Sequence, residues 1–141
     1  SHRLDDVIDQ LDGIEIWNGR ADRKNRQANA MAFELAKQWK KPVTAGSDAH
    51  VPEEIGNGTA IIEIDAFDLQ SIRQALLHGA DEVQGKRGRS ICVAKSQLQK
   101  RKRTNASITA YGKWALFAAK CFAEDCLKRK EKTHVIDCKT R

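Results

Sequence analysis

An aspartate and a histidine two residues apart, Asp48 and His50, are the side chains in this sequence best suited to metal chemistry. They lie in the segment TAGSDAH, directly after a short apolar run that predicts a buried strand. In an extended backbone, side chains two apart point the same way, so both groups can reach one divalent ion or two adjacent ions. An oxygen ligand beside a nitrogen ligand suits zinc, manganese or iron better than calcium.

Two neighbouring residues would support such a site. Gly46 lets the backbone approach a ligand closely, and the Ser47 hydroxyl is placed to hydrogen-bond a ligand carboxylate. The DxH triplet has little specificity by itself, because most such triplets lie in surface loops. The elements and motifs around it must therefore decide between a metal site and an ordinary loop.

The expected elements around the triplet alternate between strands and helices. Helical periodicity is found at 4–12, 22–40 and 68–79, and short strand patterns are found at 14–17, 42–46 and 59–64. Asp22 and Asp68 are suitable N-caps, and Gly79 closes the third helix. This order is typical of an α/β domain with parallel strands, in which ligands bind at the C-terminal strand ends. We expect the three strands to be neighbours in one largely parallel sheet, with Asp48 and His50 converging beyond the second.

Several motifs around the triplet together resemble the closing portion of a known enzyme family. In order, they are GIEIWNGR, then Asn25 and Asn29, then LAKQWKKPVTAGSDAH, and finally EIGNG. Over roughly residues 4–85 the chain is similar to metal-dependent phosphoesterases of the PHP (polymerase and histidinol phosphatase) family. In that family an Asp and a His in a motif that reads SDAH are the last pair of metal ligands, and they match Asp48 and His50.

The resemblance implies a fold and an activity. The fold would be the C-terminal part of a distorted (β/α)7 barrel, with up to three divalent metal ions (Mn, Zn or Fe) at the C-terminal strand ends. The activity would be metal-dependent hydrolysis of a phosphorylated small molecule or nucleotide. The family's HxH motif and its earlier ligands have no counterpart in this sequence. We therefore expect a longer parent protein to be the enzyme, and this chain to be a largely inactive fragment prone to self-association through uncovered apolar faces.

The motif GIEIWNGR contains three candidate supporting residues. In the family this strand lies next to the metal cluster, so Glu15 and Asn18 are expected to support the site, Asn18 by hydrogen-bonding loop backbone near the cleft. The alternative for Glu15 is a solvated carboxylate at a strand end. Arg20 faces either a substrate phosphate or, as the more common case, solvent. Asp48 and His50 remain the proposed catalytic and metal-binding pair.

The charge distribution separates the chain into two parts. The net charge is −6 before Lys86 and +12 from Lys86 onward, and together these give the formal +6 of the chain. We therefore expect an acidic folded domain over 1–85 and a basic extension over 86–141, with a helix near 107–130.

The details of the extension are less distinct. The stretch SICVA, residues 90–94, predicts one more strand, and the residues from 131 onward give no clear signal. The run of four cations at 100–103 suits weak contact with nucleic acid or an anionic membrane surface, although such runs are more often solvated linkers. A non-catalytic basic module that binds nucleic acid or a protein partner is therefore the rival to the enzyme hypothesis.

The remaining histidines and the cysteines add little. His78 ends an apolar helix face and is expected to be structural, whereas His2 and His134 receive no firm role. The four cysteines lack CxxC spacing, so free thiols in a reducing cytoplasm are expected. No apolar run is long enough to cross a bilayer, so no transmembrane segment is predicted.

Overall fold

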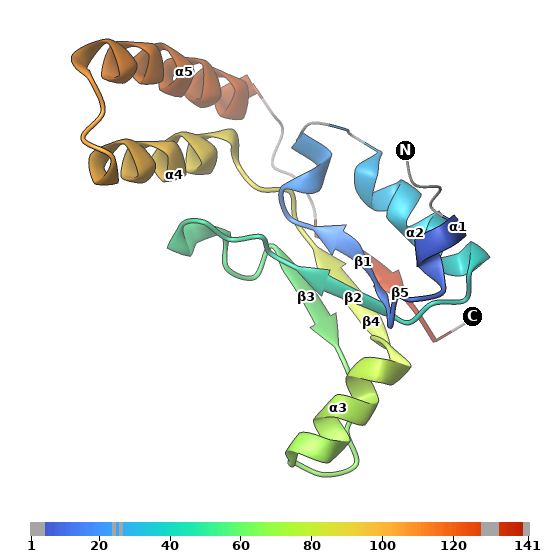
Figure 1. The fold of residues 1–141 in the computed structure, drawn as a ribbon. Coiled ribbons are helices and arrows are strands. Elements are labelled where there is room, and N and C mark those ends of the chain that lie inside the picture. The colour runs from blue at the N-terminus through green and yellow to red at the C-terminus, as the bar shows by residue number, and fades with distance from the viewer. Residues whose placement is uncertain (1–4, 24, 26, 128–132, 140–141) are drawn as a thin grey trace.

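The central feature of the fold is a pair of parallel strands joined by a helix. Figure 1 shows the computed structural model, which describes residues 5–23, 25, 27–127 and 133–139. Strand β1 (Ile14–Asn18) pairs in parallel with β2 (Val43–Gly46), and α2 (Ala28–Gln38) connects them and packs on β1. Two short helices flank this unit, α1 (Asp5–Ile8) and the 3-10 turn η1 (Ala21–Arg23). Parallel pairing of the first two predicted strands is confirmed.

Strand β1 is buried on both faces. Ile14 and Ile16 point into the core as the alternation predicts, but Trp17 on the other face is also buried. The Trp17 indole donates a hydrogen bond to the Asn57 carbonyl at 2.9 Å and lies directly over Gly85, where a Cβ would come within 2.0 Å of the ring. A second sheet therefore covers the Trp17 face of β1, for which the sequence predicted no partner. Glycine at position 85 makes room for the indole.

The second sheet is antiparallel, and this corrects the prediction for the third strand. Strand β3 (Gly58–Ile61) pairs with β4 (Glu82–Gly85), which in turn pairs with β5 (His134–Asp137). The expectation that 59–64 continues one parallel sheet with β1 and β2 is wrong. The helix α3 (Leu69–His78) returns the chain so that β4 runs back along β3 (Figure 1). Within the described residues the fold is mixed α/β, with two small sheets and no closed barrel.

The two sheets touch where two glycines meet. A Cβ on Gly58 would lie 2.2 Å from the Gly46 carbonyl oxygen, so only glycine permits this approach. Trp17, Val83 and Cys138 belong to one buried cluster with the residues of β1 and β2. The core therefore spans both sheets.

The basic extension begins as a helical hairpin. The helices α4 (Ser90–Arg103) and α5 (Ile108–Leu127) run side by side at one end of the molecule (Figure 1). The predicted strand at 90–94 is wrong, because the Asp125 carboxylate accepts the backbone N–H groups of Ser90 and Ile91, both at 2.9 Å, and caps α4. The Trp114 indole ties the helices together by donating to the Ala94 carbonyl at 2.8 Å.

The extension then returns to the sheets. The long helix near 107–130 is confirmed as far as Leu127, and 128–130 lie outside the described residues. Beyond it, β5 completes the second sheet and Cys138 is buried in the core, in a segment for which no element was predicted. Residues from both sides of the expected boundary at position 85 thus share one core.

The helix ends agree only partly with the sequence pattern. Asp68 caps α3 by accepting the Ser71 N–H at 2.8 Å, and Gly79 follows with φ of 99°, as predicted. The helix expected from Asp22 begins later, at Ala28. Asp22 still satisfies an N–H of its first turn, because its carboxylate accepts from Asn29 at 3.0 Å. In the part of the chain that the structure describes, no helix has the length and apolar character needed to span a membrane.

Candidate metal site

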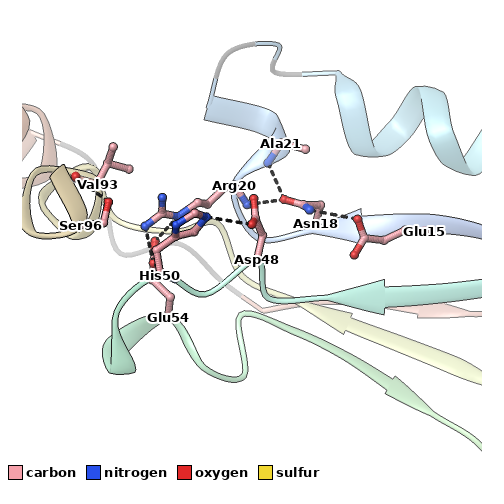
Figure 2. Close-up of polar contacts among 9 residues, drawn as sticks. All are labelled: Glu15, Asn18, Arg20, Ala21, Asp48, His50, Glu54, Val93 and Ser96. Atoms are coloured by element: carbon pink, nitrogen blue, oxygen red, sulfur yellow. Dashed lines mark hydrogen bonds and ion pairs between the residues drawn. The ribbon is translucent and has the colours of Figure 1, made fainter. Parts of the chain in front are cut away.

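Asp48 and His50 converge just past the C-terminal end of β2. Their nearest atoms, Asp48 Oδ1 and His50 Nε2, are 3.2 Å apart. Figure 2 shows the two side chains pointing toward one another. The two side chains are 42% and 55% exposed, so an ion from solvent can reach both. The predicted convergence of these side chains is confirmed, and metal binding by them stays a prediction.

The backbone brings the pair together by a route that the sequence did not indicate. Asp48 has φ of 49°, in the left-handed region, whereas the argument from spacing assumed an extended chain. For a residue other than glycine this conformation costs on the order of 1 kcal/mol, and Asp is among the residues that tolerate it best. The turn at Asp48 therefore redirects the chain while keeping both polar groups on the same side.

Glu15 and Asn18 lie beside the pair, on β1. Asn18 Oδ1 accepts the backbone N–H groups of Arg20 and Ala21 at 2.9 and 3.0 Å, which are the loop hydrogen bonds that the sequence predicted for it. Its Nδ2 donates to Glu15 Oε2 at 3.0 Å. The Glu15 carboxylate extends over the neighbouring strand, where a Cβ on Gly46 would come within 2.3 Å of Oε1. Glu15 is exposed, but its carboxylate is positioned by the hydrogen bond from Asn18 and by the space over Gly46.

The backbone of Asn18 is itself held by a buried side chain. Asn29, on α2, accepts the Asn18 N–H at 2.9 Å and donates to the Asn18 carbonyl at 3.2 Å. Asn29 is 5% exposed, so these bonds are shielded from water. The first turn of α2 therefore fixes the end of β1 at the site.

Arg20 forms a partly buried ion pair with Glu54, which is neither of the alternatives expected from the sequence. Its Nε and Nη2 donate to the two carboxylate oxygens of Glu54, at 2.7 and 2.5 Å. Glu54 is fully buried, and the same carboxylate accepts the backbone N–H of His50 at 2.9 Å (Figure 2). Arg20 is thus neither a surface arginine nor free to face a phosphate.

The charge state of Glu54 follows from these contacts. Burial alone would raise the pKa of the Glu54 carboxyl, but the hydrogen bonds from Arg20 and from the His50 backbone, with the Arg20 charge, outweigh it. The net result is a pKa below the ordinary value for Glu. Glu54 is therefore a carboxylate that anchors His50 through the main chain, and the sequence analysis did not single it out.

Ser47 stabilises a loop, and its hydroxyl bonds to backbone groups. Its hydroxyl donates to the Gly58 carbonyl at 3.2 Å and accepts N–H groups from Gly56 and Gly58, at 3.0 and 3.3 Å. These bonds close the segment between β2 and β3, which contains the 3-10 turn η2 (Pro52–Glu54). The predicted bond from Ser47 to a ligand carboxylate is not among the contacts of the described residues.

A cleft of about 470 Å³ collects most of these side chains. It is lined by Glu15, Asn18, Arg20, Ala21, Arg23, Ala28, Asn29, Ala32, Asp48, His50 and Val93. Five of the six site residues named from the sequence are on this list, and Ser47 is outside it. Arg23 and Val93 were not predicted, because their positions depend on how α4 and α5 pack against the rest of the chain.

The donor set in the cleft suits a divalent metal but is incomplete. Asp48 and His50 offer one oxygen and one nitrogen within 3.2 Å of each other. Among the described residues, no three His, Cys, Asp or Glu side chains are grouped closely enough to hold an ion. Since a catalytic metal usually has about three protein ligands, this chain fits as a contributor of two.

The other candidate residues lie away from the cleft. His134 stacks on Trp17 with ring centroids 5.1 Å apart, and His78 is exposed at the end of α3. His2 lies outside the described residues. The cations at 100–103 form the last turn of α4, where positive charge complements the helix dipole.

Comparison with protein families gives a match at the centre of the chain. A family model described as PHP-associated matches residues 26–80. The matched stretch contains α2, β2, both members of the Asp48–His50 pair, Glu54 and α3. The resemblance to the C-terminal portion of PHP-family proteins is thereby confirmed. Comparisons with curated proteins and with solved structures find no match.

Proposed function

We propose that this chain contributes Asp48 and His50 to the divalent metal site of a PHP-type phosphoesterase. The observation that carries the proposal is the 3.2 Å approach of Asp48 Oδ1 to His50 Nε2 at the open side of a cleft. The left-handed backbone at Asp48 adds support, because strained backbone conformations cluster at functional sites. The PHP-associated segment around the pair supplies the family context.

Each residue would have a defined task. Asp48 contributes an anionic oxygen ligand, and His50 contributes a neutral imidazole nitrogen. Glu54 and Arg20 hold the His50 backbone, and Asn18 holds the end of β1 together with Glu15. A bound manganese, zinc or iron ion would supply Lewis acidity at the phosphate oxygens and lower the pKa of water. The remaining ligands, for up to three ions, would come from a longer parent protein whose barrel this chain completes.

Metal titration of the chain tests the ligand assignment directly. We expect weak Mn²⁺ binding, because two protein ligands hold an ion poorly. Asp48→Asn should abolish it, whereas Asp12→Asn, at an exposed carboxylate outside the cleft, should leave it unchanged. Electron paramagnetic resonance of free Mn²⁺ measures both. Equal binding by the chain and by Asp48→Asn would contradict the assignment.

A phosphatase assay tests the activity. We expect the parent protein to hydrolyse phosphoesters with added manganese or zinc, the chain alone to do so poorly or not at all, and Asp48→Ala in the parent to be inactive while still folded. Circular dichroism of the variant checks the fold. Turnover by the chain equal to that of the parent would show that the chemistry takes place elsewhere.

A further inference from the structure

The cleft holds two arginines, and they are in different electrostatic situations. Arg20 is neutralised by both oxygens of the buried Glu54 carboxylate. Arg23, in η1, lines the same cleft, and no carboxylate pairs with it within the described part of the chain. Arg23 therefore has no ion-pair partner among the described side chains, and it shares the cleft with the acidic groups Glu15 and Asp48.

The helical hairpin positions Arg23. Its guanidinium lies over the ring of Phe117, on α5, with Cζ 5.6 Å from the ring centroid. Cys121, one turn further along α5, lies close enough for the Arg23 charge to act against the rise that burial causes in the pKa of its thiol. The Arg23 side chain also hydrogen-bonds the Cys121 thiol. Because the aromatic contact uses the face of the guanidinium and the thiol takes one of its five N–H groups, other N–H groups along its edges are left for an oxyanion.

The hairpin also forms a wall of the cleft. Val93, on α4, is one of the lining residues, and Figure 2 shows it on the side of α4 toward His50. The α2 residues that face the cleft include Ala28 and Ala32, whose small side chains leave space near Arg23. The basic extension thus takes part in building the cleft, which is a role that the charge pattern alone did not indicate.

We propose that Arg23, held on Phe117 by the α4–α5 hairpin, is the phosphate-binding side chain of this cleft. The ligand class is a phosphate monoester, whose oxygens match the fork of the guanidinium. The identification of the anion as a substrate phosphate rests on the proposed function. The cleft then has a metal-binding side at Asp48 and His50 and an anion-binding side at Arg23.

Titration with phenylphosphonate, a phosphate ester mimic that cannot be hydrolysed, tests the proposal on the whole chain. Calorimetry without metal gives the affinity of the anion side alone. We expect Arg23→Gln to weaken binding by at least about tenfold, because it removes charge-assisted hydrogen bonds. Arg23→Lys should retain part of the affinity, since lysine keeps the charge but lacks the fork. Phe117→Leu should weaken binding by a few fold, because the guanidinium loses its support.

A matched control separates this role from general charge. Arg73→Gln removes an exposed arginine on α3, outside the cleft, and should leave the affinity unchanged. The proposal would be overturned by any of three results. These are no phenylphosphonate binding by the unmodified chain, unchanged affinity in Arg23→Gln, or an equal loss of affinity in Arg73→Gln.

A second readout keeps this result distinct from the metal assignment. Arg23→Gln should still bind Mn²⁺, whereas Asp48→Asn should lose Mn²⁺ and bind phenylphosphonate at least as tightly as the unmodified chain, because it removes a negative charge from the cleft. If the chain binds no Mn²⁺, the metal assignment fails, and the metal-free titrations still decide the role of Arg23.

Discussion

At the scale of single residues, Glu54 has the largest effect on how the candidate site is built. Its carboxylate is fully buried and accepts hydrogen bonds from the Arg20 side chain and from the His50 backbone. A buried charge is tolerated only when it is paired and hydrogen-bonded, and both conditions hold here. One side chain therefore couples the end of β1 to the loop that carries the proposed ligands.

Removing the Glu54 carboxylate should destabilise the protein strongly. Glu54→Ala leaves Arg20, whose side chain is 14% exposed at the cleft, without its counter-ion, and we expect a loss of about 2–4 kcal/mol of unfolding free energy, somewhat below the cost for a fully buried pair. The matched control is Glu53→Ala at the next residue, where the carboxylate pairs with Lys95 and both partners are half exposed. That change should alter stability little. Urea unfolding of both variants makes the comparison, and equal losses would show that the buried pair has no special role.

The same carboxylate should make stability depend on pH. Because the folded-state pKa of Glu54 lies below the ordinary 4.5, its contribution is present above that pH and is lost as the pH falls through the folded value. Glu53 and Asp68 have pKa values shifted in the same direction, so they add to the acid sensitivity. We expect the unfolding free energy to decrease more steeply below about pH 4.5 in the unmodified chain than in Glu54→Gln. Parallel pH profiles would contradict this.

At the scale of elements, the hairpin of α4 and α5 combines specific contacts between its helices with exposed positive charge at the end of α4. Its inner contacts are specific, with Asp125 capping α4 and Trp114 bonded to the Ala94 carbonyl. The last turn of α4 presents Lys100, Lys102 and Arg103 to solvent, whereas the guanidinium of Arg101 is bonded to Gln97 and Ala110. Three exposed cations at a helix end are enough for a weak electrostatic contact and too few for a strong one.

We propose that nucleic acid binds this turn only weakly and in a salt-dependent way. If the three exposed cations each neutralise a phosphate of a single strand, affinity should fall roughly 70-fold between about 20 mM and about 150 mM salt. Fluorescence anisotropy with a short labelled oligonucleotide measures this. Replacing the three cations with glutamine should remove most of the binding. Tight, salt-resistant and sequence-selective binding would instead favour the non-catalytic module.

At the scale of the whole molecule, β5 connects the C-terminal part of the chain to the core formed by the N-terminal part. This strand pairs with β4, and Cys138 just beyond it is buried with the residues of β1 and β2. Apolar side chains nevertheless remain exposed, notably Phe67 and Leu69 before and at the start of α3 and Ile108 at the start of α5. Self-association through such faces stays a prediction.

The contribution of β5 can be measured with two neighbouring residues. Ile136 is partly buried against the core, whereas Val135 is 59% exposed. Ile136→Ala should lower the unfolding free energy by about 1–3 kcal/mol, because buried methyl groups are lost and a cavity remains. Val135→Ala should change it much less. Chemical denaturation of the two variants measures both losses of unfolding free energy. A larger loss for Val135→Ala would mean that Val135, and not Ile136, faces the core.

The sequence by itself determined the features that depend on local pattern. Spacing predicted that Asp48 and His50 converge after a strand, and the order of short apolar strands separated by a helix predicted the parallel pair of β1 and β2. Asp68 and Gly79 marked the ends of α3, because capping and left-handed turns are properties of single residues.

Only the tertiary structure decided the features that depend on distant partners. The stretch SICVA forms a helix because Asp125, 34 residues after Ile91, caps it, and no local pattern contains that information. Strand β3 joins an antiparallel sheet because β4 and β5 pair beside it, the latter from a segment with no signal of its own. Arg20 is withdrawn from the surface by Glu54, which is also 34 residues away, so the role of its charge was fixed by folding and not by its own neighbourhood.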